Sequence, residues 1–182
     1  PPHLYTATKL AGEYYAHAYA KLYGLEPTVL RYGIPYGPRA RPAGVIALFV
    51  RKALKGEPLT IQGDGMQFRK FVYVEDLAEG NVLALKPGAA NSTYNLDGNE
   101  KVSIRQLAET VQGILGSVEI EYLPARPGDF SGKEVSSEKA RKELGWAAST
   151  TLEDGVRSYI EWLAEQEKVR EADWAMVDER LR

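Results

Sequence analysis

Residues 4–39 read LYTATKLAGEYYAHAYAKLYGLEPTVLRYGIPYGPR, and this stretch decides the fold. Residues 4–23 are rich in Ala, Leu, Lys and Tyr and lack Pro, so they predict a helix that Gly24 ends as its C-cap. Residues 27–32 have the short, β-branched composition of a buried strand. The Pro-rich loop GIPYGPRARPAG follows at residues 33–44, and loops of this length between a strand and a helix are often functional.

The rest of the chain continues this alternation of helices and strands. Apolar spacing and N-cap residues predict helices at 45–54, 75–85, 103–115 and 137–144, and another that starts at the Thr150 to Glu153 capping box and runs through Trp162. Short apolar or alternating runs predict strands at 59–62, 71–74, 92–96 and 118–122, with GDG at 63–65 as a hairpin turn. The charged tail keeps an apolar stripe and is predicted as a last helix. This pattern predicts an α/β protein.

Composition excludes several classes of protein. The 182 residues carry a formal net charge of −2, which gives no whole-chain reason to expect nucleic acid or a membrane surface as partner. The absence of cysteine excludes disulfides and thiolate chemistry, and His3 and His17 are not spaced as zinc ligands. No apolar run approaches the roughly 20 residues of a membrane span. The expectation is a cytoplasmic protein without a metal.

Tyr5 and Lys9 form the first chemically informative pair. Four residues apart on a helix, they share one face, so the Lys9 ammonium would favour the ionised form of the Tyr5 phenol. Such a phenol can act as a general base on an alcohol. Taken alone, however, the pair is better explained as an ordinary exposed helix face, because Tyr14, Tyr15 and Tyr19 show that this helix is tyrosine-rich.

Downstream motifs reverse that interpretation. The chain has, in order, PxxYxxxKxxxE at 2–13, LRYxxxYGPR at 30–39, GEPLTIxGDGxQxRxFVYVED at 56–76 and RPGDF at 126–130. From Pro1 to about Trp162 it thereby resembles the extended short-chain dehydrogenase/reductase family, and within it the NAD-dependent nucleotide-sugar epimerases and dehydratases, including the UDP-glucose 4-epimerases. The resemblance covers most of the chain.

The resemblance implies the C-terminal part of a Rossmann-type, doubly wound parallel sheet together with a small α/β substrate-binding domain. Residues 1–43 would be the remnant of the dinucleotide-binding domain, carrying the catalytic helix and the strand after it. Residues 44–167 would mainly form the substrate-binding domain, with elements around 70–90 returning to the Rossmann part. Residues 168–182 would be a helical tail.

The resemblance also implies roles for individual residues. Tyr5 would take the proton from the 4-hydroxyl of the sugar while a hydride passes to NAD, and Lys9 would hold the nicotinamide ribose. The expected cofactor-binding residues are Tyr5, Lys9, Tyr32 and Gly33. The expected substrate-binding residues are Val45, Ile61, Gln62, Arg69, Arg126 and Asp129. Of these, Arg69 and Arg126 would grip the diphosphate, since a guanidinium can bond two phosphate oxygens at once.

Several positions depart from the family pattern. Gly33 and Ile34 stand where an aromatic residue and an asparagine are often found, Gln62 replaces a frequent aromatic residue, and Lys70 replaces the usual aspartate. The Gly-rich dinucleotide fingerprint has no match, and the resemblance implies that it lies upstream of Pro1 with the remaining catalytic Ser or Thr. We therefore expect no turnover from this chain alone.

The leading hypothesis is an NAD-dependent epimerase acting at carbon 4 of a UDP-hexose. A dehydratase or reductase on the same scaffold is a second hypothesis, because the Tyr-Lys pair serves all three reactions. A non-catalytic module that binds nucleotide sugars or dimerises is a third. The resemblance also implies a homodimer or another homo-oligomer, with a nucleotide sugar as the small-molecule partner.

Overall fold

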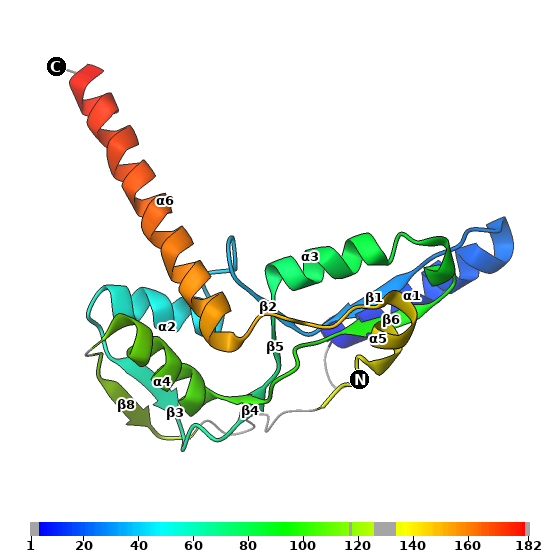
Figure 1. Cartoon of the computed structure of the whole chain (residues 1–182), viewed down its shortest axis with the longest axis horizontal. Coiled ribbons are helices and arrows are strands. Elements are labelled where there is room, and N and C mark those ends of the chain that lie inside the picture. Colours follow the sequence, from blue (N-terminus) through cyan, green and yellow to red (C-terminus); the bar gives the residue numbers. More distant parts are fainter. Residues whose placement is uncertain (1–3, 117, 126–133, 181–182) are drawn as a thin grey trace.

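A computed structural model describes residues 4–116, 118–125 and 134–180, with side chains described as far as residue 166. Figure 1 shows the order and arrangement of its helices and strands. They are α1 (Leu4–Tyr23), β1 (Val29–Tyr32), β2 (Ile34–Tyr36), α2 (Val45–Leu54), β3 (Leu59–Gln62), β4 (Phe68–Arg69), β5 (Phe71–Tyr73), α3 (Val74–Leu83), the 3₁₀ turn η1 (Pro87–Ala89), β6 (Thr93–Leu96), β7 (Val102–Ser103), α4 (Ile104–Leu115), β8 (Ile120–Leu123), α5 (Glu138–Leu144) and α6 (Leu152–Arg180).

Parallel pairing dominates among the described strands. β1 pairs with β6, β2 with β5 and β3 with β8, all parallel, whereas β4 and β7 pair antiparallel. The first pair runs in register from Val29 opposite Thr93 to Tyr32 opposite Leu96. Parallel strands joined through helices are the mark of an α/β protein, as the sequence predicts.

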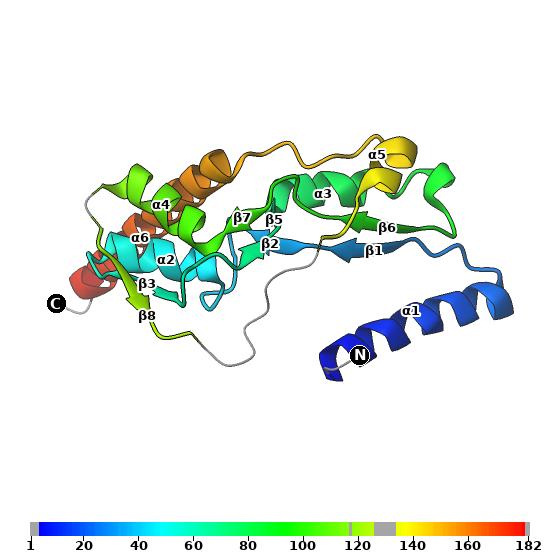
Figure 2. The same cartoon turned by 90° about the horizontal axis from the view of Figure 1, so that it is seen from below.

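Helices cover both faces of the β1–β6 pair. Successive side chains of a strand point to opposite faces, and here Arg31 reaches Glu13 of α1 while Tyr32 reaches Asn81 of α3. Figure 2 shows the strand pair lying between α3 and α1. This arrangement of helices on both sides is typical of doubly wound sheets.

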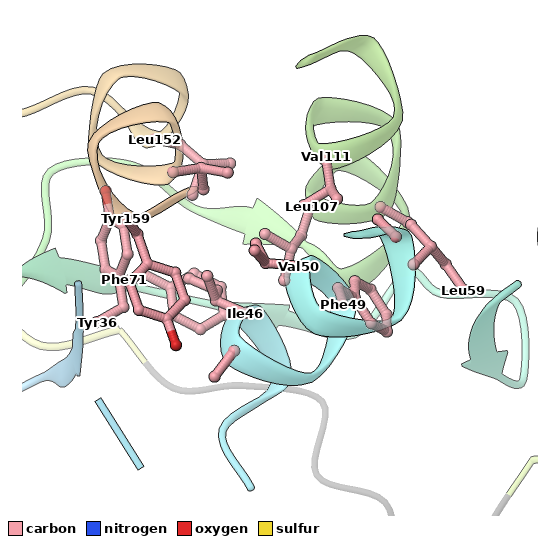
Figure 3. Close-up of a cluster of buried hydrophobic side chains, with 14 of the residues drawn as sticks. Tyr36, Ile46, Phe49, Val50, Leu59, Phe71, Leu107, Val111, Leu152 and Tyr159 are labelled. Carbon is pink, nitrogen blue, oxygen red and sulfur yellow. The ribbon is translucent and has the colours of Figure 1, made fainter. Parts of the chain in front are cut away.

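The larger hydrophobic core gathers around α2, α4 and the first turns of α6. Figure 3 shows side chains from these helices meeting residues of β2, β3 and β5. The pattern on α4 explains its place, because Leu107, Ala108 and Val111 recur at helical spacing and are fully buried. Ser103 caps this helix by accepting a hydrogen bond from the Gln106 backbone N–H.

A second core lies between β6, α3 and α5. Its largest member is Trp146, which is 1% exposed and donates from its indole nitrogen to the Asp76 carbonyl at 2.8 Å. Asp76, in the first turn of α3, is itself buried. Its carboxylate accepts hydrogen bonds from both the hydroxyl and the backbone N–H of Ser149 and of Thr150.

Several predictions from the sequence need correction. The cap of α6 is Thr151, which accepts from the Asp154 backbone N–H, because the Thr150 hydroxyl is engaged with Asp76. GDG at 63–65 is no hairpin turn, since β3 and β4 each pair with another strand. Residues 34–36, predicted as loop, form β2, and the main chain of α6 runs without a break to Arg180.

None of the described helices is both long and apolar enough to cross a membrane.

Candidate active site

An ion pair fixes how α1 lies against β1. Arg31 donates to both carboxylate oxygens of Glu13, at 2.8 Å from Nε and 2.5 Å from Nη2. These hydrogen bonds hold the pKa of Glu13 below its ordinary value. The helix and the strand run in opposite directions (Figure 2), so residues before Glu13 lie toward the carboxyl end of β1. At about 1.5 Å per helical residue, Lys9 lies about 6 Å and Tyr5 about 12 Å beyond Glu13 in that direction.

Tyr5 and Lys9 lie together on α1. The Lys9 Nζ is 5.3 Å from the centre of the Tyr5 ring, and the Tyr5 side chain is 71% exposed. The ammonium therefore faces the ring as well as water. No residue of α1 is buried, and residues 4–10 are all exposed. Both side chains are thus open to a ligand from solvent.

The carboxyl ends of β1 and β6 bring Tyr32, Gly33 and Asp97 together. The Gly33 backbone N–H donates to the Leu96 carbonyl at 2.8 Å, which extends the parallel pairing by one residue. The Tyr32 hydroxyl donates to Asn81 Oδ1 at 2.7 Å. Ligands of open α/β sheets bind outside the carboxyl ends of the strands, so these residues occupy the edge where a cofactor or substrate is expected.

Asp97 is a polar residue at this edge that the sequence analysis did not select. Its side chain is 6% exposed, and burial raises the pKa of its carboxyl, while the Gly98 N–H and the charge of Lys70 lower it. Its backbone N–H donates to the Ser137 hydroxyl. An acidic residue directly after the buried run TYNL was the available signal, because charged side chains are seldom buried without a role.

The expected substrate-binding residues lie on several elements around β3 and β4. Arg69 ends β4 opposite Val102, Gln62 ends β3, and Val45 begins α2; all three are half-buried. Arg69 donates to the Phe68 carbonyl at 2.8 Å. Ile61 is different, because its side chain is fully buried in the larger core. Arg126 and Asp129 lie outside the described residues.

The described residues hold no cluster of His, Cys, Asp and Glu suited to a metal ion. The Tyr32 phenol and the buried Asp97 carboxylate lie at the carboxyl ends of β1 and β6, and the phenol of Tyr5 and the ammonium of Lys9 lie on α1 beside β1. Such a set can move a proton on an alcohol and bind an anion.

The fold and this edge define an α/β protein of the dinucleotide-binding type. The model of the NAD dependent epimerase/dehydratase family matches residues 1–97, and the chain belongs to that family. The predicted fold class, with a Rossmann-type parallel sheet, is thereby confirmed.

Curated relatives and solved structures agree with this assignment. The chain is 34% identical over 163 residues to a UDP-glucuronate 4-epimerase of Thermodesulfobacterium geofontis, covering 88% of this chain and 50% of the relative. It is 32% identical to a dTDP-glucose 4,6-dehydratase of Salmonella typhimurium, covering 89% of this chain and 47% of the relative. The structure of a UDP-glucose 4-epimerase of Thermotoga maritima with UDP-glucose superimposes with a TM-score of 0.81 at 36% identity, covering 87% of this chain and 52% of that one. The chain spans about half the length of these proteins.

Proposed function

We propose that this chain carries the Tyr-Lys pair and the substrate side of an NAD-dependent epimerase that acts at carbon 4 of a UDP-hexose. The observation that supports this most is the Arg31–Glu13 ion pair. It sets α1 so that Lys9 and Tyr5 extend beyond the carboxyl end of β1, toward the side where Tyr32 and Gly33 lie. A ligand at that edge would have a phenol and an ammonium within reach.

The residues at this edge suit NAD. The exposed Tyr5 hydroxyl and Lys9 ammonium offer hydrogen-bond donors one helical turn apart, which fits the hydroxyls of a nicotinamide ribose. Tyr32 and Gly33 would line the same side. When bound, NAD supplies the chemistry of accepting a hydride from the sugar and returning it. The charge of Lys9 would stabilise the Tyr5 phenolate, which takes the proton of the sugar 4-hydroxyl and becomes the neutral phenol.

The substrate side is proposed to bind the diphosphate of a UDP-sugar. Arg69 supplies a permanent positive charge from the end of β4. In the RPGD segment, Arg126 would also bind the diphosphate, and Asp129 would bind the ribose. The Thermotoga maritima structure contains UDP-glucose, and this supports a UDP-sugar as ligand here.

A nucleotide-sugar 4,6-dehydratase is the second candidate. The match to the dehydratase of Salmonella typhimurium covers 89% of the chain at 32% identity, and the match to the epimerase relative covers 88% at 34%. Both reactions begin with the same proton and hydride removal, so Tyr5 and Lys9 serve either. Product analysis distinguishes them, since only the dehydratase eliminates water.

Binding of UDP tests the proposed substrate site. In calorimetric titrations of the chain with UDP and with UDP-glucose, we expect Arg69→Ala to weaken both affinities at least about tenfold, because the loss of a charged phosphate contact costs about 1.5–3 kcal/mol. Arg157→Ala is the matched control, since among the residues that the structure describes that arginine pairs with Glu153 on the surface of α6. Equal affinities for the wild type and Arg69→Ala would remove Arg69 from the site.

The exposed apolar side chains of α1 support a homo-oligomer. Tyr14, Tyr15, Tyr19 and Leu22 are all more than half exposed, and monomeric proteins seldom leave such a patch open. We expect sedimentation at micromolar concentration to show a species of at least twice the chain mass, and Tyr15→Glu to shift it toward the monomer. A clean monomer for the wild type would contradict this proposal.

A further inference from the structure

Asp97 has an acceptor oxygen that the fold leaves unused. Asp76 and Asp97 are the buried charged residues of the described part of the chain. Asp76 accepts four hydrogen bonds, but Asp97 accepts one, to Oδ1 from the Gly98 N–H at 2.9 Å. Oδ2 accepts none from any described residue.

This second oxygen is nevertheless accessible. The side-chain polar atoms that are both sealed from solvent and unpaired in the described residues are Arg105 Nε and the Tyr159 hydroxyl. Asp97 Oδ2 is therefore not sealed, although most of its residue is buried. A carboxylate oxygen that is held in place and keeps one open side is ready to accept a hydrogen bond from a ligand.

One side of Asp97 faces the residues proposed to line the cofactor. A Cβ placed on Gly33 would overlap Asp97 Oδ1, so the carboxylate lies over Gly33 and occupies the space that a side chain would take. Gly33 directly follows Tyr32 at the end of β1. The Asp97 carboxylate therefore lies next to the position proposed for the cofactor.

The segment proposed to bind the diphosphate also lies near Asp97. The charge of Lys70, the residue after Arg69, acts on the Asp97 carboxyl. The Ile34 backbone N–H donates to the Lys70 carbonyl at 3.4 Å, which holds this segment beside the end of β1. Asp97 thus lies against Gly33 and within reach of the charge of Lys70, the residue after Arg69.

We propose that Asp97 is a specificity-determining residue that accepts a hydrogen bond from a sugar hydroxyl and disfavours sugars bearing a carboxylate. This rests on the proposed function. The sugar of a nucleotide sugar connects the diphosphate to the carbon that reacts at the cofactor, and Asp97 lies near both proposed subsites, against Gly33 and near Lys70. A neutral hexose offers hydroxyl donors to Oδ2. A hexuronate instead brings a second negative charge into a partly dehydrated site, and the two carboxylates repel each other.

Three ligands test this inference on the 182-residue chain by calorimetry: UDP, UDP-glucose and UDP-glucuronate. Asp97→Asn keeps the shape of the side chain and an acceptor for the Gly98 N–H but removes the charge. We expect the ratio of the UDP-glucose affinity to the UDP-glucuronate affinity to fall at least about tenfold, with the affinity for UDP unchanged. A purely structural role would change all three affinities together.

Lys70→Gln provides a second variant that leaves the Asp97 side chain itself unchanged. Without the positive charge near Asp97, we expect UDP-glucuronate to bind more weakly and the same ratio to rise. Thermal melts of both variants check the fold. An unchanged ratio in Asp97→Asn, or an equal change for all three ligands, overturns the inference while leaving the proposed function in place. If the wild type binds neither UDP nor UDP-glucose, the proposed function fails, and the inference fails with it.

Discussion

Replacing Tyr5 by Phe is expected to lower kcat at least about 100-fold, because general acid-base catalysis contributes about 10²–10⁴ and the substitution removes only the hydroxyl. The measurement is epimerisation of UDP-glucose with NAD present. It is made on whichever form of the protein turns over, either the chain alone or the chain joined to the preceding half of a relative. The affinity for UDP should stay unchanged, since Tyr5 acts on the sugar.

Tyr14→Phe is the matched control for this prediction. Tyr14 lies on the same helix and is 75% exposed, so its substitution makes the same chemical change without touching the proposed site. We expect its kcat to equal that of the wild type. If the kcat of Tyr5→Phe equals that of the wild type, the Tyr5 phenol is not the base.

Asp76→Ala is expected to lower the free energy of unfolding by about 2–3 kcal/mol, because it leaves buried donors without their charged acceptor. The Asp76 carboxylate accepts from the hydroxyls of Ser149 and Thr150 at 3.1 and 3.0 Å and from their backbone N–H groups at 3.3 and 3.1 Å. The removed group also lies in the first turn of α3, where negative charge is favourable. Urea unfolding followed by circular dichroism measures the change.

Glu75→Ala serves as the control for that measurement. Glu75 is the neighbouring acidic residue in the same first turn but is exposed, so its loss should cost only the helix-dipole contribution, about 0.3–1 kcal/mol. Equal losses for the two variants would show that the hydrogen bonds to Ser149 and Thr150 add nothing to stability.

Most elements of the fold were predictable because their signals are local. Gly24 follows the helix at 4–23, and Gly56 and Pro58 follow the helix at 45–54. Ser103, the capping residue that the sequence indicates, precedes α4. β2 was missed because Pro35 and flanking glycines are typical of loops, yet parallel pairing with β5 makes the segment a strand. The Thr150 cap was wrong because Asp76, 74 residues away, competes for its hydroxyl.

In the candidate site too, the residues with a local sequence signal were predicted, and those that depend on contacts between distant residues were missed. Tyr5, Lys9 and Arg69 could be selected because they belong to motifs that are defined by residue types and their spacing in the sequence. Ile61 was selected in the same way, but its alternation with Gln62 on β3 places its side chain in the core. Asp97 was missed, because its place directly after TYNL was a weak local signal and its approach to Gly33 and Lys70 exists only in the folded chain.

The ion pair between Arg31 and Glu13 makes the placement of α1 dependent on ionic strength. The Arg31 side chain is 52% exposed, so dissolved ions reach the pair and screen it, with a Debye length of about 10 Å at 0.1 M salt. Since α1 buries no residue, little apolar contact replaces the attraction that added salt removes. The contact that holds the helix of Tyr5 and Lys9 at β1 therefore weakens as the salt concentration rises.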